Sequence, residues 1–297
     1  MRVAIVGATG LIGRALDASL RGDDHHVVAV VRRPDDESVH NRTPYVWDAQ
    51  SPLPADAVAG CDAVVNLAGA SISQRWTRRA KDEIFESRVR VTEHVADAAA
   101  EAAVPVLVNG SAVGYYGAGE QPVTERAAHG TGFLADVCVA WERAAMRAEG
   151  AGVRVVRIRT GIVLAREGGA LPTLTRVARL GLSGPIGGGR QWFPWIHIAD
   201  HIAAVRHVIE GPEIAGPVNL VAPAVVRQRE FARVLGRVLR RPAVLPAPRV
   251  LVRALLGEVA STVTTGQHAV PDVLRSTGFT FRFPEVEGAL RDLLGTA

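Results

Sequence analysis

The stretch Val3-Ala-Ile-Val6-Gly7-Ala-Thr-Gly10-Leu-Ile-Gly13 decides the fold, because a short apolar run leads directly into three evenly spaced glycines. Residues 3–6 predict a buried strand, and the residues after Gly10 predict the start of a helix. Glycines at such a turn permit a tight bend, a close approach of the backbone to a pyrophosphate, and close helix–strand packing. The helix N-terminus offers free N–H groups to phosphate oxygens. We therefore expect a dinucleotide-binding loop; the alternative is a structural glycine turn.

Further apolar runs alternate with amphipathic segments along the first half of the chain. The runs are rich in β-branched residues without polar alternation, which is typical of strands buried on both faces. The clearest amphipathic segment predicts a helix over residues 77–102. Strands are expected at residues 3–6, 27–31, 45–47, 63–67, 104–108 and 153–158. This order predicts an α/β fold, a Rossmann-type doubly wound parallel sheet.

The pattern changes after about residue 164, where glycines and prolines become frequent and several short helices follow. We expect a dinucleotide-binding domain over residues 1–225, with residues 165–192 contributing to a substrate lobe. A small, mainly helical C-terminal domain is expected over residues 246–295. Trp195-Ile-His-Ile198 is interpreted as a strand returning to the sheet, and Asp200 as the cap of the next helix.

Composition excludes several classes of protein. The 297 residues carry a net charge of +4 and are 48% hydrophobic, as in globular proteins. The arginines are spread along the chain, without the basic clusters of nucleic-acid-binding proteins. Two cysteines make no disulfide framework, so the expected location is cytoplasmic. No apolar run is long enough for a membrane span, and the histidines lack metal-ligand spacing.

The end of the second expected strand indicates which dinucleotide binds. NAD sites place an Asp or Glu there to hold the ribose 2′-hydroxyl. Here Val31 is followed by Arg32 and Arg33, and the first acid is Asp35. Because a guanidinium matches the 2′-phosphate of NADP, we expect NADP as the cofactor. The alternative is two solvated arginines on a loop.

Motifs further along the chain occur in an order that resembles one protein family. They are Asn66-Leu-Ala-Gly69, Glu86-Ser-Arg-Val89, Ser111-Ala-Val-Gly-Tyr-Tyr-Gly117, Arg159-Thr-Gly-Ile-Val-Leu164, Trp195-Ile-His-Ile198 and Asn219-Leu-Val-Ala-Pro223. Together with the glycine loop they resemble the atypical extended short-chain dehydrogenase/reductases, in the "epimerase family protein" subgroup of the NAD-dependent epimerase/dehydratases. The resemblance covers nearly the whole chain.

The resemblance implies an NADP-binding Rossmann domain with a substrate lobe over the strand ends. Arg32 and Arg33 would meet the 2′-phosphate, and Asp48 would lie near the adenine. Arg88 would lie near the cofactor; its alternative role is a helix-surface ion pair. The remaining implied cofactor residues form two groups, on the glycine loop and after the fourth expected strand: Gly7, Thr9, Gly10, Leu11, Ile12, Leu67, Ala68 and Gly69.

The sequence departs from the family's Tyr-x-x-x-Lys pair, in which a phenol of lowered pKa exchanges a proton with the substrate. Lys81 is the only lysine, and none of the three tyrosines lies four residues before it. With Glu142 as an anchor, the positions of the pair fall on Leu134 and Cys138. Leucine cannot transfer a proton, and cysteine carries no fixed positive charge. A nucleophilic role and a packed helix cysteine both stay open for Cys138.

Ser111, Tyr115 and Tyr116 are the best remaining catalytic candidates. Counted from Tyr116, the family's Ser/Thr position falls on Ala112 instead of Ser111, and Tyr116 also fits a structural turn. His197 is either a proton donor or a structural histidine. Two functions follow: an NADP-dependent oxidoreductase or epimerase-like enzyme on a small molecule, or a non-catalytic NADP(H)-binding sensor.

Overall fold

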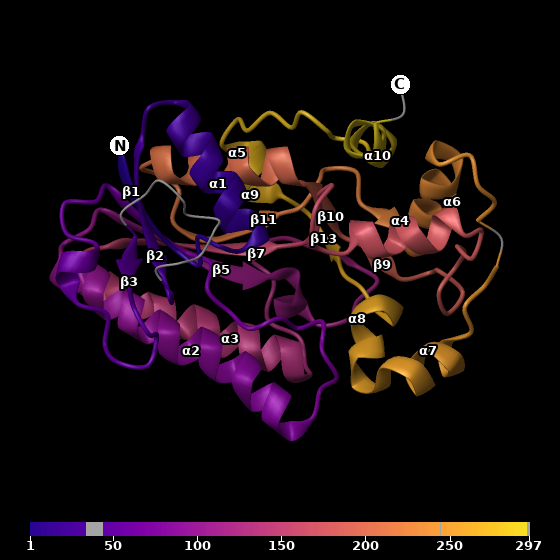
Figure 1. The fold of residues 1–297 in the computed structure, drawn as a ribbon, viewed down its shortest axis with the longest axis horizontal. Coiled ribbons are helices and arrows are strands. Elements are labelled where there is room, and N and C mark those ends of the chain that lie inside the picture. Colours follow the sequence, from indigo (N-terminus) through magenta and orange to yellow (C-terminus); the bar gives the residue numbers. More distant parts are fainter. Residues whose placement is uncertain (34–43, 244, 296–297) are drawn as a thin grey trace.

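The computed structural model describes residues 1–33, 44–243 and 245–295. A seven-stranded, entirely parallel sheet forms its centre, in the order β11-β7-β5-β4-β1-β2-β3 (Figure 1). The order reverses between β1 and β4, which is the hallmark of the predicted Rossmann-type doubly wound sheet. The strands are β1 (Arg2–Val6), β2 (His26–Val31), β3 (Tyr45–Val46), β4 (Ala63–Asn66), β5 (Val106–Ala112), β7 (Arg154–Thr160) and β11 (Gly216–Leu220).

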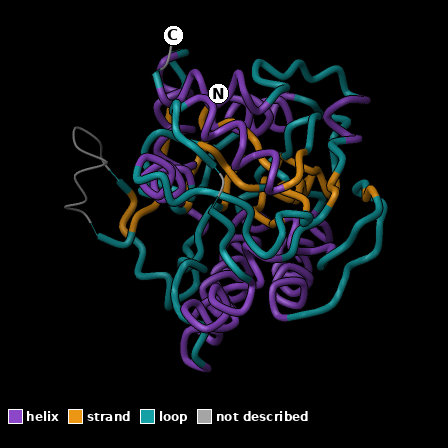
Figure 2. Tube along the Cα trace, turned by 90° about the vertical axis from the view of Figure 1, so that its right-hand side faces the viewer, coloured by secondary structure: helices purple, strands orange, loops and turns teal. Residues whose placement is uncertain are grey.

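Alternate residues of each strand enter the two cores on opposite faces of the sheet. Val3 and Ile5 of β1 pack with α1 and α5, whereas Ala4 and Val6 pack on the side of α2. All four side chains are almost fully buried, which explains the apolar runs without alternation. Helices cover both faces in Figure 2. They include α1 (Leu11–Gly22), α2 (Arg78–Glu101), α3 (Phe133–Ala145) and α5 (Ile198–Glu210).

The expected long helix is α2, and its first turn has a local cause. Thr77 is the N-cap, and its hydroxyl accepts a hydrogen bond from Ala80 N. The cap satisfies one of the N–H groups that a helix start leaves without a partner. Below the sheet in Figure 1, α2 runs beside α3, which carries the positions of the missing Tyr/Lys pair.

A smaller lobe forms a third apolar core around the buried side chains of Trp195 and Phe231. Helices α4 (Leu171–Arg179), α6 (Gln228–Val238) and α10 (Val286–Leu294) line this core. The C-terminal part of the chain also contains α7 (Arg249–Leu256), α8 (Ser261–Thr264) and α9 (Asp272–Ser276). Short strands connect it to the rest: β6 (Pro122–Val123), β8 (Ile162–Leu164), β9 (Trp192–Phe193), β10 (Trp195–His197), β12 (Val226–Arg227) and β13 (His268–Ala269). Short 3-10 helices complete the described elements: η2 (Ala55–Ala57), η3 (Val113–Tyr116), η4 (Met146–Ala151) and η5 (Gly257–Ala260).

Two local expectations are wrong. The strand at Trp195–His197 does not return to the central sheet, because it pairs with β8 in a separate two-stranded sheet. Asp200 does not cap α5. The cap is His197, whose Nδ1 accepts from Ala199 N, while both oxygens of Asp200 accept from the backbone N–H groups of Arg282 and Phe283.

The C-terminal segment is tied to the Rossmann part. Strand β13 pairs with β6, and Leu274 of α9 enters the core that contains Val3 and Ile5. The predicted division at residues 225 and 246 stays a prediction.

Candidate functional site

The glycine loop has the geometry that a close approach to phosphate requires. Gly7 has a φ of +85°, and a Cβ there would lie 3.0 Å from Ala68 N at the end of β4. A Cβ on Gly13 would lie 2.3 Å from Gly7 O, so only glycine lets α1 pack this close to the turn. Both positions exclude side chains for steric reasons, which supports a loop built for close approach.

The N-terminus of α1 is open for an anion. Gly10 is its N-cap and has no side chain to bond the first N–H groups. Thr9, Leu11 and Ile12 are partly exposed around it. Unpaired N–H groups and the positive end of the helix dipole suit the oxygens of a pyrophosphate. The residues present therefore fit the phosphates of a dinucleotide.

The predicted 2′-phosphate residues follow β2 directly. Arg32 and Arg33 are both exposed, at the carboxyl end of a strand that pairs with β1. Asp35 lies outside the described residues. Asp48 follows β3, and its Oδ1 accepts from Gln50 N at 2.8 Å and Ser51 N at 3.1 Å. These hydrogen bonds, that from Gln50 first, lower the pKa of the Asp48 carboxyl.

The end of β4 forms the other wall of the crevice. Leu67, Ala68 and Gly69 follow the strand, and Leu67 N donates to Val6 O at 2.8 Å. Leu67 and Ala68 are partly exposed and Gly69 is exposed, so this backbone is accessible beside the glycine loop. The structure thus brings the two predicted groups of cofactor residues together at the reversal of strand order.

Arg88 does not form the alternative helix-surface ion pair. Its Nη1 donates to Ala70 O at 3.0 Å and to Ile84 O at 3.2 Å, and its guanidinium lies over the Trp141 ring. In the described ranges no carboxylate lies within ion-pair distance of it. Burial lowers the pKa of Arg88 by disfavouring its charge.

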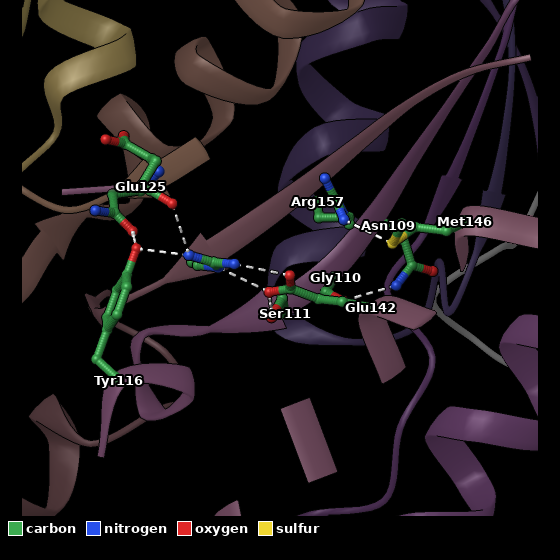
Figure 3. A network of polar contacts seen from close by, with 10 residues as sticks. Asn109, Gly110, Ser111, Tyr116, Glu125, Glu142, Met146 and Arg157 are labelled. Carbon is green, nitrogen blue, oxygen red and sulfur yellow. Dashed lines mark hydrogen bonds and ion pairs between the residues drawn. The ribbon is translucent and has the colours of Figure 1, made fainter. Parts of the chain in front are cut away.

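Ser111 lies in a buried charge network at the end of β5, where the register places it opposite Arg159 of β7. Its hydroxyl donates to Glu142 Oε1 at 2.7 Å. The Arg159 guanidinium binds the same carboxylate through two hydrogen bonds of 2.8 and 2.9 Å. Figure 3 shows Ser111 and Glu142 side by side at this point. The Ser111 hydroxyl is therefore engaged inside the protein.

Tyr116 closes the other end of the network. Its hydroxyl donates to Asn219 Oδ1 at 2.7 Å and accepts from Arg159 Nη1 at 2.9 Å (Figure 3). Burial raises the pKa of Tyr116 to about 12, although the Arg159 charge acts in the opposite direction. This shift is opposite to the lowered pKa that a catalytic phenol needs, and the hydroxyl is already engaged by Asn219 and Arg159, so the geometry favours the structural interpretation of Tyr116.

Tyr115 is the remaining predicted candidate, and its hydroxyl lies outside this network. The side chain is partly buried, and the Arg159 guanidinium carbon lies 3.5 Å from its ring centroid. The rings of Tyr116 and His129 meet it edge to face. The ring is therefore held from several sides, and its hydroxyl has no partner in the network.

The positions of the missing pair face the same turn. A Cβ on Gly114 would lie 3.5 Å from Leu134 Cβ and 4.0 Å from Cys138 Sγ. Cys138 is buried, and burial raises the pKa of its thiol to about 11. The thiol is neutral at physiological pH, which favours a packed cysteine over a nucleophile.

His197 is buried and caps α5, and burial lowers its pKa. Its contacts support the structural interpretation. Lys81 pairs with Glu258 and lies 5.3 Å from the Phe133 ring centroid, as expected for a side chain that joins surface segments. Among the described residues, no three His, Cys, Asp or Glu side chains are grouped to hold a metal ion.

Glu125 was missed by sequence reasoning. Its Oε1 accepts from Asn219 N at 3.0 Å and from Val273 N at 3.3 Å. The residue is buried, although it follows β6 in a loop where glutamate is usually solvated. No local pattern marks it, because its partners lie 94 and 148 residues further along the chain.

The Rossmann sheet, the glycine loop and the lobe over the strand ends define a dinucleotide-binding protein of the extended short-chain dehydrogenase/reductase type. Residues 3–220 match the model of the NAD dependent epimerase/dehydratase family, and residues 247–293 match the domain of unknown function DUF1731. The chain belongs to the NAD-dependent epimerase/dehydratase family.

Similar proteins carry the subgroup name. The epimerase family protein Mb2239 of Mycobacterium bovis is 42% identical over 294 residues, which are 97% of this chain and 96% of that protein. The crystal structure of human epimerase family protein SDR39U1 with NADPH superposes with a TM-score of 0.90 at 36% identity, and covers 100% of both chains. A nucleoside-diphosphate sugar epimerase from Corynebacterium glutamicum has a TM-score of 0.82 at 33% identity, covering 99% of this chain and 58% of that one.

The described part of the chain contains no helix that is both long and apolar enough to span a bilayer.

Proposed function

We propose that this chain binds NADP(H) and acts as an oxidoreductase or epimerase-like enzyme on a small molecule. The observation that carries the proposal is the steric exclusion of side chains at Gly7 and Gly13, which keeps backbone N–H groups open beside β4. The similarity to a human protein crystallised with NADPH supports it. Arg32 and Arg33 supply the charge for a 2′-phosphate.

When bound, the nicotinamide supplies or accepts a hydride. The chain's own part is to orient the substrate and to move a proton. Tyr115 is the proposed proton donor, because the hydroxyls of Ser111 and Tyr116 are held in the buried network. Arg159 and Tyr116 hold the ring of Tyr115 in place.

The cofactor proposal is tested by titrating the protein with NADPH and NADH. NADPH is expected to bind at least tenfold more tightly, because one charge-assisted contact to the 2′-phosphate contributes about 1.5–3 kcal/mol. Arg32→Ala combined with Arg33→Ala should remove most of this preference. Equal affinity of the unaltered protein for both cofactors contradicts the assignment of NADP.

The catalytic proposal is tested by replacing single hydroxyls. Once a carbonyl substrate has been found by NADPH oxidation over a broad panel, Tyr115→Phe should lower kcat by at least about 100-fold while leaving the NADPH affinity unchanged. Tyr116→Phe is the matched control on the neighbouring residue, and it should act mainly on stability. Full activity of Tyr115→Phe contradicts the role of Tyr115.

A non-catalytic NADP(H)-binding sensor is the second candidate. It is favoured by the replacement of the family's catalytic pair with Leu134 and Cys138, and by the engagement of the Ser111 hydroxyl. The two functions differ in whether a metabolite is changed. An oxidoreductase moves deuterium from labelled NADPH to a metabolite, and an epimerase-like enzyme interconverts two isomers without net change of the cofactor, whereas a sensor binds the cofactor and does neither.

We also propose that the protein is cytoplasmic and that its partner is a small molecule rather than nucleic acid. Cys61 and Cys138 are both buried free thiols, which suits a reducing compartment. Cell fractionation and a gel-shift assay with random DNA and RNA test these two points.

A further inference from the structure

One end of the molecule carries charge of a single sign. Residues 171–199 and 231–257 contain nine arginines and no aspartate or glutamate, whereas the whole chain has a net charge of +4. Along the sequence these arginines are dispersed, but the two segments include α4, α6 and α7, which all lie at the right-hand end in Figure 1. The fold therefore gathers a positive charge, while the remainder of the chain is acidic on balance.

The two segments lie side by side where α4 ends and α7 begins. Leu245 N donates to Ser183 O at 3.2 Å, and Gly187 N donates to Ala247 O at 2.9 Å. A Cβ on Gly187 would lie 3.5 Å from Arg249 Cβ. The residues that follow α4 and those that lead into α7 therefore form one continuous surface.

Aliphatic side chains protrude from this surface. They range from 40% exposed for Val177 to 81% exposed for Val250, and they make up five of the nine exposed large hydrophobic side chains in the described part of the chain. Single exposed apolar side chains are ordinary, but a group of them marks a contact surface. These residues form the apolar edge: Val177, Leu180, Leu182, Leu245 and Val250.

Four exposed arginines flank the apolar edge. Arg176 and Arg179 lie in the last turn of α4, directly before Leu180. Arg249 and Arg253 lie on α7, and Arg253 shares a helix face with the residue three positions before it, Val250. Over the described ranges no carboxylate lies within ion-pair distance of any of the four. Their charge is therefore not neutralised within the chain.

The combination of charge and aliphatic side chains distinguishes between possible occupants. A second copy of the chain would set arginine against arginine, because a two-fold interface uses the same patch from both subunits. Single-stranded nucleic acid stacks on aromatic side chains, whereas the exposed large hydrophobic side chains described here are all Leu, Val or Met. An anionic bilayer meets both features, with negative headgroups for the arginines and an apolar layer beneath them for the aliphatic side chains.

We propose that the apolar edge and its four flanking arginines dock this protein on an anionic lipid surface. The arginines meet the headgroups, and the aliphatic side chains between them enter the boundary of the acyl layer. Binding of this kind depends on charge and on buried apolar area together. The inference goes beyond the proposed function, because none of these residues belongs to the cofactor crevice or to the buried polar network.

The charge is tested by co-sedimentation of the full chain with vesicles of equal amounts of phosphatidylserine and phosphatidylcholine, compared with pure phosphatidylcholine. Binding is expected only to the anionic vesicles, and it should be lost at about 1 M salt, where the Debye length is about 3 Å. Arg176→Gln combined with Arg179→Gln should weaken binding by roughly 25-fold, since each arginine near such a surface contributes about fivefold. Arg90→Gln combined with Arg143→Gln removes two exposed arginines from α2 and α3 and is the matched control, which should leave binding unchanged.

The apolar contribution is tested by Leu180→Ser combined with Leu182→Ser, which should weaken binding to the anionic vesicles by at least about tenfold. Val46→Ser replaces a side chain of 49% exposure on β3 and should leave binding unchanged. Thermal unfolding checks that each variant is folded, as expected for substitutions of exposed side chains.

Failure of the unaltered protein to bind the anionic vesicles overturns the proposal, and so does binding that neither pair of substitutions weakens. Sedimentation velocity covers the other occupant. A dimer that dissociates on Leu180→Ser with Leu182→Ser, in a protein that does not bind vesicles, would assign this surface to a second copy and overturn the proposal as well.

Discussion

The buried ion pair between Arg159 and Glu142 allows a quantitative prediction. Their side chains are 3% and 5% exposed, and two hydrogen bonds of 2.8 and 2.9 Å join them. In the unaltered protein burial lowers the pKa of Arg159, but the hydrogen bonds and charge of Glu142 raise it further. Glu142→Gln removes that negative charge and leaves Arg159 as a buried cation without its carboxylate partner, because a guanidinium keeps its proton in proteins. Breaking one side of such a pair costs about 3–5 kcal/mol.

An exposed pair of similar geometry provides the control. Arg147 binds Asp97 through two contacts of 3.1 and 2.9 Å, with side chains 50% and 54% exposed. Asp97→Asn should cost less than about 1 kcal/mol, because water screens this pair and Arg147 also keeps Glu93 at 3.5 Å. The two ion pairs therefore differ far more in how deeply they are buried than in the lengths of their hydrogen bonds.

Denaturant unfolding of both variants measures how much free energy of unfolding each substitution removes. At about 2.1 cal/mol/K of unfolding entropy per residue, a loss of about 4 kcal/mol should lower the Tm of the 297-residue chain by roughly 6 °C. The pair Arg159→Met and Glu142→Leu together should cost less than the sum of the single changes, since neither charge is left alone. Equal losses in Glu142→Gln and Asp97→Asn would refute the argument from burial.

Three further outcomes follow from the structure. Gly13→Ala places a Cβ 2.3 Å from Gly7 O, so NADPH affinity measured by fluorescence should fall at least tenfold; unchanged affinity would contradict the steric role of Gly13. Burial lowers the pKa of His201 to about 3, below its unfolded value of about 6.5. The free energy of unfolding should therefore fall as the pH drops from about 6.5 toward 3. This group contributes a slope of up to about 1.4 kcal/mol per pH unit. His201→Gln should remove that share of the slope in pH-dependent unfolding. Burial raises the pKa of Cys61, and that of Cys138 to about 11, so a thiol reagent at pH 8 should label both only after unfolding; rapid labelling of native Cys138 would restore its nucleophilic interpretation.

The cofactor loop was predictable because its causes are local. A Cβ on Gly13 would meet Gly7 and Ala8, only a few residues away, although one on Gly7 would meet Leu67 and Ala68 after β4. The apolar strands reflect burial on both faces in their own composition. The position of β10 was not predictable in the same way, since the short run Trp195-Ile-His197 indicates a strand but not which strand it pairs with.

The contacts of the buried polar network could not be predicted from the sequence for a related reason. Ser111 meets Arg159 only through the register between β5 and β7, and one residue of slip would turn the side chain to the other face. Tyr116 was a catalytic candidate with a structural turn as the alternative, and the sequence could not decide between them. Its partner Asn219 lies 103 residues away, and only the fold brings the two groups together.

Because the chain is synthesised from its N-terminus, the parts of the molecule can fold only in a certain order. The glycine loop, β4 and Arg88 leave the ribosome early, and Glu142 is followed by Arg159 only 17 residues later. The partner of Glu125 and Tyr116, Asn219, is synthesised much later, and the second partner of Glu125, Val273, later still. A nascent chain therefore contains every residue of its cofactor crevice well before the buried network of Glu125, Tyr116 and Asn219 can form. A bound dinucleotide would stabilise the folded Rossmann part while the last helices are still being synthesised.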